Sequence, residues 1–213
     1  MYLIGAGGHA KVVIDLIRMT GEKIEGIFDD DLLTDNVLGY KIVGKIDKAP
    51  KEKGPFIITI GNNSIRKRIV KKFNLSYKSV KGNCYISSDA SIGDGSVVMN
   101  GVCINVGAQI GRHVIINTGA CVDHECIIED FVHISPNATL AGNVIVKEGT
   151  HIGLGAQVVQ GICIGKWATI GAGTVVIKNI PDYAVVVGVP GKIIKYNEQE
   201  QENMAFFPSY GRG

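Results

Sequence analysis

The chain has 213 residues, of which 22 are Lys or Arg and 20 are Asp or Glu, so its formal net charge is +2. This near balance gives no reason to expect nucleic acid or an anionic membrane as a partner. No apolar run approaches the length of a bilayer span, and the first residues lack the features of a signal peptide, so we expect a cytoplasmic protein. The five cysteines include no CxxC pair, and we interpret them as reduced packing residues.

Residues 1–80 predict a small Rossmann-like α/β domain. The pattern is an apolar strand at 2–4, a glycine turn at 5–10, a helix that ends near Gly21, and a second strand at 23–28. Gly7 and Gly8 lie where such a βαβ unit brings a phosphate to the N–H groups of a helix N-terminus. Asp29 follows Gly7 at about the interval of a ribose-hydroxyl acceptor. The alternative interpretation is a tight turn followed by solvated acids.

The second half of this domain carries an apolar strand at 56–60 and a basic helix. Asn62 or Asn63 would cap that helix. Its core face is formed by Ile65, Ile69, Val70 and Phe73. Arg66 is on the other face, which we interpret as solvated, and it is the one basic residue there that we expect near a phosphate. The domain is too short for a full dinucleotide fold, so a mononucleotide-type ligand is more natural than NAD.

Residues 86–176 repeat every six positions, which predicts a parallel β-helix. The repeat places a branched aliphatic residue at Ile86, Ile92, Val98, Ile104, Ile110, Ile116, Val122, Ile128, Ile134, Leu140, Val146, Ile152, Val158, Ile164, Ile170 and Val176. The residues two positions earlier are uncharged and mostly small, so both series can face one narrow interior. Three hexads form a coil of 18 residues, and about five coils fill a domain that we place at 84–196. Residues 197–213 then form a C-terminal tail.

Among the histidines of the repeat, which are His113, His124, His133 and His151, His124 alone lies in an acidic cluster, Asp123-His124-Glu125. Histidine is the natural general base near neutral pH, and a neighbouring carboxylate orients its ring. Gly142 is 18 residues further on, directly over His124 in the next coil, so the space beside the ring is free of a side chain. Its N–H is a candidate oxyanion donor. The alternative is a surface histidine in an acidic turn.

His133 and His151 are also 18 residues apart and should stack on one edge, either as part of a site or as a polar edge without a role. His133 is half a coil from His124, so the two lie on opposite sides of one chain. A site that uses both must therefore lie between subunits, and a triangular prism favours a homotrimer. The chain lacks the HxxxxH pair of the γ-type carbonic anhydrases, which share this type of fold, and we expect no metal site.

Several segments together resemble one family, the sugar O/N-acyltransferases of the sialic acid O-acetyltransferase NeuD type. The resemblance covers nearly the whole chain and is carried by GAGGHAKVV, Phe28-Asp29-Asp30, IGNNSIRKRI, the hexads, NTGACVDHECII and GVPGK. Within this family the chain is most similar to the nucleotide-sugar N-acetyltransferases of bacillosamine and perosamine biosynthesis. The resemblance implies a left-handed parallel β-helix after the Rossmann-like domain, with acetyl-CoA as cosubstrate.

The same resemblance implies roles for individual residues. His124 matches the catalytic base, Glu125 the carboxylate that supports it, and Gly142 the backbone donor. The positions that match nucleotide-sugar binding are Gly7, Gly8, His9, Asp29, Asp30, Gly61, Asn63 and Arg66. The positions that match acetyl-CoA binding across the trimer interface are His133, Leu154 and Ala172. Gly7 replaces a serine of some relatives, which leaves the choice of base open, and no role transfers to the tail.

The function implied is acetyl transfer, by direct attack, to the 4-amino group of a UDP- or GDP-linked 4-amino-4,6-dideoxy sugar, in the biosynthesis of a bacterial surface glycan or glycoprotein. One alternative is a sugar O-acetyltransferase of the sialic acid type. A second, from another class, is a non-catalytic scaffold that binds nucleotide sugars. A third is a Rossmann oxidoreductase, which the GxGxxA turn favours but which does not explain the solenoid.

Overall fold

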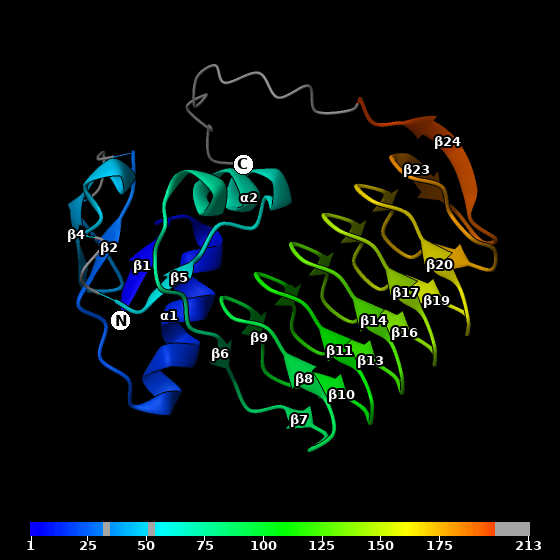
Figure 1. Cartoon of the computed structure of the whole chain (residues 1–213), viewed down its shortest axis with the longest axis horizontal. Coiled ribbons are helices and arrows are strands. Elements are labelled where there is room, and N and C mark those ends of the chain that lie inside the picture. Colours follow the sequence, from blue (N-terminus) through cyan, green and yellow to red (C-terminus); the bar gives the residue numbers. More distant parts are fainter. Residues whose placement is uncertain (32–34, 51–53, 199–213) are drawn as a thin grey trace.

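The computed structural model describes residues 1–31, 35–50 and 54–198. It consists of an N-terminal α/β domain and a parallel β-solenoid whose coils run away from that domain (Figure 1). The elements of the first part are β1 (Tyr2–Ile4), α1 (Gly8–Thr20), β2 (Gly26–Phe28), β3 (Asn36–Val37), β4 (Tyr40–Gly44), the 3₁₀ helix η1 (Ile46–Lys48), β5 (Phe56–Ile58) and α2 (Asn63–Lys72).

The α/β domain is built around a sheet of strand order β3-β4-β2-β1-β5. Strands β4, β2, β1 and β5 are parallel, and β3 is antiparallel to β4. Helix α1 covers one face of the sheet and α2 covers the other. Gly21 ends α1 in the left-handed conformation, and the Asn62 side chain accepts the Ile65 N–H at 3.0 Å as the cap of α2, as the sequence predicts.

Helix α1 also joins the two parts of the chain. Its apolar residues Val13 and Leu16 belong to one buried cluster with Val97 and Ile115 of the solenoid. The helix therefore lies between the α/β sheet and one side of the solenoid. The N-terminus of α1, where the sequence predicts a phosphate, is in this way directed along the solenoid surface.

The solenoid confirms the 18-residue coil. Strands one coil apart pair in parallel, so that Cys103 is the partner of Cys121 and Ile110 the partner of Ile128. The first sheet contains β7 (Tyr85–Ile86), β10 (Cys103–Ile104), β13 (Cys121–Val122), β16 (Thr139–Leu140), β19 (Gln157–Val158) and β22 (Val175–Val176). The second contains β8 (Ser91–Ile92), β11 (Gln109–Ile110), β14 (Ile127–Ile128), β17 (Ile145–Val146) and β20 (Cys163–Ile164).

The third sheet closes the prism and carries the C-terminal hairpin. It contains β6 (Val80–Lys81), β9 (Val97–Val98), β12 (Ile115–Ile116), β15 (His133–Ile134), β18 (His151–Ile152), β21 (Thr169–Ile170), β23 (Ala184–Val187) and β24 (Lys192–Tyr196). The aliphatic and small series of the repeat pack together in one continuous core from Val98 to Val186, with Cys126 inside it. Each coil buries its apolar side against the next one.

The predicted tail begins at Asn197, whose side-chain amide donates to Trp167 O and Thr169 Oγ1 at 3.1 Å. Residues 199–213 lie outside the described residues. Among the described residues, neither helix reaches the length and apolarity of a membrane span.

Candidate active site

His124 lies in the corner turn between β13 and β14, at the junction of the first and second sheets. Its side chain is 49% exposed, and its Nδ1 atom is 3.5 Å from Oε2 of Glu125. Glu125 has a φ of +57°, a conformation that is uncommon for a residue other than glycine. The same left-handed conformation recurs at this corner position in other hexads, and the pair expected from the sequence is formed within a single turn.

Asp123, the other acid of the cluster, holds the turn itself. Its Oδ1 atom accepts the His124 N–H at 2.7 Å and the Asn105 side-chain amide at 2.8 Å. The bond from Asn105, followed by the bond from the His124 N–H, lowers the pKa of Asp123, so the carboxylate stays charged. Asn105 is one coil before Asp123, and the 18-residue period could have identified this pair in the sequence.

Gly142 lies over the His124 ring, as the period of 18 predicts. A Cβ atom at this position would collide with Nε2 and Cε1 of His124. The two turns are tied together by the Asn143 N–H, which donates to His124 O at 2.9 Å. The absence of a side chain at position 142 therefore lets the His124 ring lie directly against the backbone of residue 142, with its Nε2 atom on the side of the ring away from Glu125.

His133 lies in β15 on the third sheet, whereas His124 lies at the junction of the other two. Within one chain the two residues are on opposite sides of the prism, as the sequence predicts. Leu154 and Ala172 lie one coil apart in the corner turns that join the third sheet to the first, and the Leu154 side chain is exposed. Leu154 and Ala172 thus share one corner, and none of the three residues predicted to bind acetyl-CoA lies at the corner of their own His124.

The N-terminal domain brings His9 to His133, a contact that no pattern in the sequence indicates. The His9 and His133 ring centroids are 6.5 Å apart, and His133 stacks on His151 at 4.9 Å. Desolvation lowers the pKa of His9 to about 4 and that of His133 to about 3, so both rings are neutral at pH 7. His151 Nε2 is 2.8 Å from Ser135 Oγ, and His133 Nε2 is 3.2 Å from the Asn117 amide.

The remaining predicted substrate positions gather at the carboxyl ends of the parallel strands of the α/β sheet. Gly7 and Gly8 begin α1, and a Cβ atom added at either would meet nothing within 4 Å, so the helix N-terminus is open. The carboxylate of Asp29 accepts the N–H of Ala6 and thereby holds the glycine turn. These turns at the ends of adjacent strands form the place where open α/β sheets bind ligands.

Asp30 and Gly61 complete that edge. Asp30 Oδ1 accepts the Ile46 N–H at 3.1 Å, which fixes the turn after β2. Gly61 follows β5, the neighbour of β1, and a Cβ atom at Gly61 would again meet nothing within 4 Å. The two glycine turns, after β1 and after β5, therefore lie side by side.

Arg66 and Asn63 require a correction. The interpretation of the α2 face as solvated is wrong for Arg66, which is 1% exposed and donates to backbone carbonyls of the solenoid. Asn63 is buried as well, and its amide donates to Gly149 O at 3.0 Å. The periodicity of a single helix cannot distinguish solvent from a second domain. Arg66 and the Asn63 amide nitrogen bond to carbonyls at the domain junction, whereas Asn63 Oδ1 has no hydrogen-bond partner among the described residues, and the contact of either residue with a ligand stays a prediction.

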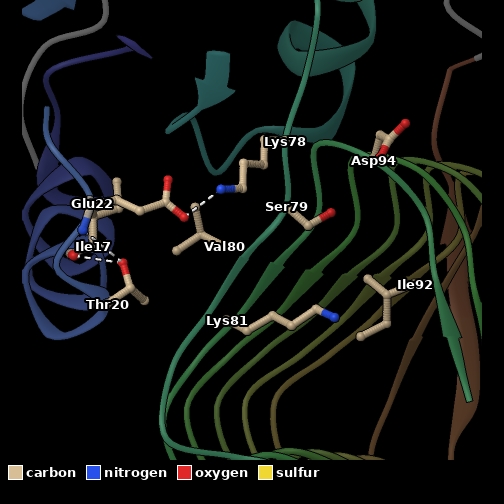
Figure 2. Close-up of a pocket in the computed structure, with 9 residues that line it drawn as sticks. All are labelled: Ile17, Thr20, Glu22, Lys78, Ser79, Val80, Lys81, Ile92 and Asp94. Carbon is tan, nitrogen blue, oxygen red and sulfur yellow. Dashed lines mark hydrogen bonds and ion pairs between the residues drawn. The ribbon is translucent and has the colours of Figure 1, made fainter. Parts of the chain in front are cut away.

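The described residues also form a cleft away from the predicted site. A cleft of about 400 Å³ opens between the end of α1 and the first coil, with Lys78 and Glu22 paired across it at 2.6 Å (Figure 2). Its nine lining residues include none of the predicted site positions. Within the described ranges, no group of three or more His, Cys, Asp or Glu side chains is arranged to hold a metal ion.

The chain is similar to proteins of known family. The PglD N-terminal domain family matches residues 1–73. A mutant of perosamine N-acetyltransferase from Caulobacter crescentus, solved with CoA and GDP-perosamine, is 37% identical, with a TM-score of 0.87 over 91% of this chain and 96% of that one. The acetyltransferase domain of PglB from Neisseria gonorrhoeae, solved with acetyl coenzyme A, is 36% identical, with a TM-score of 0.86 over 91% and 98%.

Curated sequences match over shorter regions. UDP-N-acetylbacillosamine N-acetyltransferase of Bacillus subtilis is 39% identical over 108 residues, which are 46% of this chain and 50% of that protein. The uncharacterized protein L142 of Acanthamoeba polyphaga mimivirus is 40% identical over 101 residues, and only 21% of its length is covered. The chain thus matches half or less of each of these two proteins. Its likeness to the solved enzymes extends over nearly their whole length, and by that likeness it belongs to the family of hexapeptide-repeat nucleotide-sugar N-acetyltransferases.

Proposed function

We propose that the chain transfers an acetyl group from acetyl-CoA to the 4-amino group of a UDP- or GDP-linked 4-amino-4,6-dideoxy sugar. The observation that carries the proposal is the half-exposed His124 ring, paired with a carboxylate and lying against the Gly142 backbone, in a chain that matches a sugar N-acetyltransferase over 91% of its length. The matched enzymes were solved with CoA, acetyl-CoA and GDP-perosamine, which supports the same classes of substrate here. Their two nucleotides, in GDP-perosamine and UDP-N-acetylbacillosamine, leave both bases as candidates.

The arrangement supports direct attack. With Nδ1–H facing the Glu125 carboxylate, Nε2 of His124 is the free base. It takes a proton from the neutral sugar amine as the nitrogen bonds to the thioester carbonyl carbon. The Gly142 N–H stabilises the oxyanion, the C–S bond then breaks, and the CoA thiolate leaves with the proton that His124 returns. In this scheme no covalent acyl-enzyme is formed.

We further propose that each site is formed between two subunits of a homotrimer. The first sheet connects the corner of His124 to the corner of Leu154 and Ala172. Its outward-facing residues carry no charge and are Tyr85, Cys103, Cys121, Thr139, Gln157 and Val175. The corner between the second and third sheets carries Asp94, Arg112, Asp130, Glu148, Lys166 and Asp182. A site that uses both corners needs the first sheet to lie between neighbouring subunits, so we expect that sheet to face the partners, and the absence of charge on it suits the core of an interface.

In this trimer the acetyl-CoA residues His133, Leu154 and Ala172 of one subunit face His124 of the next. The glycine turns of the α/β domain, with Gly7, Gly8, His9, Asp29, Asp30 and Gly61, hold the nucleotide sugar. We place the enzyme in the cytoplasm, in the biosynthesis of a bacterial surface glycan or glycoprotein. Sedimentation of the purified chain tests the assembly, and a monomer at micromolar concentration contradicts it.

A single screen tests the function. Purified enzyme is mixed with acetyl-CoA and a panel of UDP- and GDP-linked 4-amino sugars, and release of the CoA thiol is followed. We expect saturable release with at least one sugar and a product that carries one acetyl group by mass. Treatment with hydroxylamine cleaves an ester but leaves an amide intact, so it separates O- from N-acetylation. If no sugar in the panel gives release of the CoA thiol, the proposal is overturned.

A further inference from the structure

Helix α2 begins directly after the turn that follows β5, and it packs against the corner of the solenoid. Its Arg66 side chain reaches both. The Nη1 atom donates to Gly61 O at 3.0 Å and to Ile60 O at 3.3 Å, which belong to the turn. The Nε atom donates to His113 O at 3.1 Å, and Nη2 donates to Phe131 O at 2.9 Å, which belong to two successive coils.

We propose that Arg66 is a positioning residue, which fixes the substrate turn of residues 60–61 onto the solenoid and so sets where the nucleotide sugar lies. This inference rests on the proposed function. It assigns Arg66 a different role from the phosphate contact that the resemblance implied. The guanidinium is suited to this role, because its rigid fork can serve several acceptors in fixed directions.

The charge of Arg66 supports a role beyond packing. The hydrogen bonds just described all end on backbone carbonyls, so they satisfy the donors without supplying a negative charge. Burial of a cation in this way is unfavourable, and it lowers the pKa of Arg66 to about 9. The same cation contributes to the lowered pKa values of His9, His133 and His151, so its field extends into the group of histidines at the substrate edge. An anionic ligand held there would supply the missing counter-charge.

Neighbouring contacts dock the same helix in a different way. Asn63 donates to Gly149 O and Thr150 O, and Lys67 pairs with Glu148 at 2.6 Å while its ammonium lies 5.0 Å from the Trp167 ring. These bonds join α2 to the solenoid only. The bonds of Arg66 join α2 both to the solenoid and to the turn of residues 60–61. Removal of the Lys67 pair therefore loosens the docking of α2 and leaves the hold on the turn, which provides a matched control.

The test compares Arg66→Met and Arg66→Lys with Lys67→Gln in the full chain. We expect Arg66→Met to raise the KM for the nucleotide sugar about tenfold or more, since several hydrogen bonds from one charged group are lost. The Kd for CoA, measured by calorimetry, should stay within about twofold of wild type. Arg66→Lys should recover part of the effect, because an ammonium can satisfy some of the carbonyls. Lys67→Gln should leave both constants near wild type.

Hydrogen exchange reads the same role without a substrate. Exchange of residues 58–62, which precede α2, should be faster in Arg66→Met than in wild type and unchanged in Lys67→Gln. The inference is overturned if that segment exchanges alike in all variants, or if Arg66→Met weakens CoA and nucleotide-sugar binding equally, as a general loss of structure would. Failure of the wild type to acetylate any nucleotide sugar would instead overturn the proposed function. The exchange result needs no substrate, so it would still show whether Arg66 holds the turn.

Discussion

His113 and His124 both lie in corner turns of the solenoid, and their environments are opposite. His113 lies between the second and third sheets, and His124 lies between the first and second. His113 is fully buried, stacks on Phe131 at 5.3 Å, and has a φ of +55°. His124 is about half exposed. At its corner the position in the hexad that corresponds to His113 is held by Glu125, which has the same left-handed backbone conformation. The α/β domain covers the first corner and leaves the second open.

Each of these histidines also leans over a glycine of an adjacent coil. A Cβ atom at Gly95 would collide with the His113 ring, just as one at Gly142 would collide with the ring of His124. At both corners the glycine lets the ring lie against the backbone of the adjacent coil, but the His113 ring is buried there and the His124 ring is half exposed. A glycine 18 residues from a histidine therefore does not identify a catalytic site. The exposure of the ring and a nearby carboxylate make the distinction.

The largest expected effect is at the exposed member of this comparison. We expect His124→Asn to lower kcat about a thousandfold, because the amide cannot take the proton of the attacking amine. The Kd for CoA, measured by calorimetry, should stay near the wild-type value, since the positions proposed to hold acetyl-CoA belong to the neighbouring subunit. A kcat within tenfold of wild type contradicts the assignment of His124 as the base.

Gly142→Ala tests whether activity requires the close approach of the His124 ring to the backbone of residue 142. The added methyl group collides with Nε2, so we expect kcat to fall about a hundredfold, as for a displacement of the base by about 1 Å. Gln160→Ala is the matched control, because Gln160 occupies the same corner one coil further on, and its kcat should stay near wild type. Equal activity of Gly142→Ala and Gln160→Ala contradicts the proposed geometry.

Asn105→Ala addresses the support of the open turn. The variant removes the 2.8 Å bond to Asp123, the carboxylate that holds the His124 N–H. We expect kcat to fall about tenfold while both KM values change little. The lost hydrogen bond has a charged acceptor, Asp123, which in turn holds the backbone of His124. Gln109→Ala, on the exposed face of the second sheet, is the control. A fall in thermal stability without a change in kcat would show that Asn105 supports the fold alone.

The sequence predicted the solenoid, the α/β domain and the placement of Gly142 over His124, because a strict period fixes which residues lie one coil apart. It did not predict what covers each face. Nothing in the pattern around Arg66 distinguishes a solvated helix face from a buried domain junction, and nothing near His9 indicates the approach of His133. Both contacts join segments about 50 to 125 residues apart, and they depend on the docking of two domains.

The smallest expected effect concerns the buried member, His113, and acid stability. Burial, together with the charges of Arg112 and Arg66, lowers its pKa to about 4 in the folded chain, from an ordinary value of 6.5. Between these values the unfolded chain binds more protons than the folded one, so stability falls as the pH drops from 6.5 toward 4 and levels off below. His9 and His133 shift in the same direction. We expect Tm to drop by about 5 °C or more between pH 7 and pH 5.

His113→Phe should reduce that drop, because phenylalanine keeps the stack on Phe131 and cannot take up a proton. Neither nitrogen of His113 has a hydrogen-bond partner among the described residues, so the substitution removes no bond that an imidazole makes there. Gln160→Ala changes no titratable group, so it is the control and should show the same pH dependence as wild type. If the Tm of His113→Phe falls as steeply with acid as that of wild type, the acid sensitivity resides elsewhere, and the contrast between the two corners does not extend to protonation.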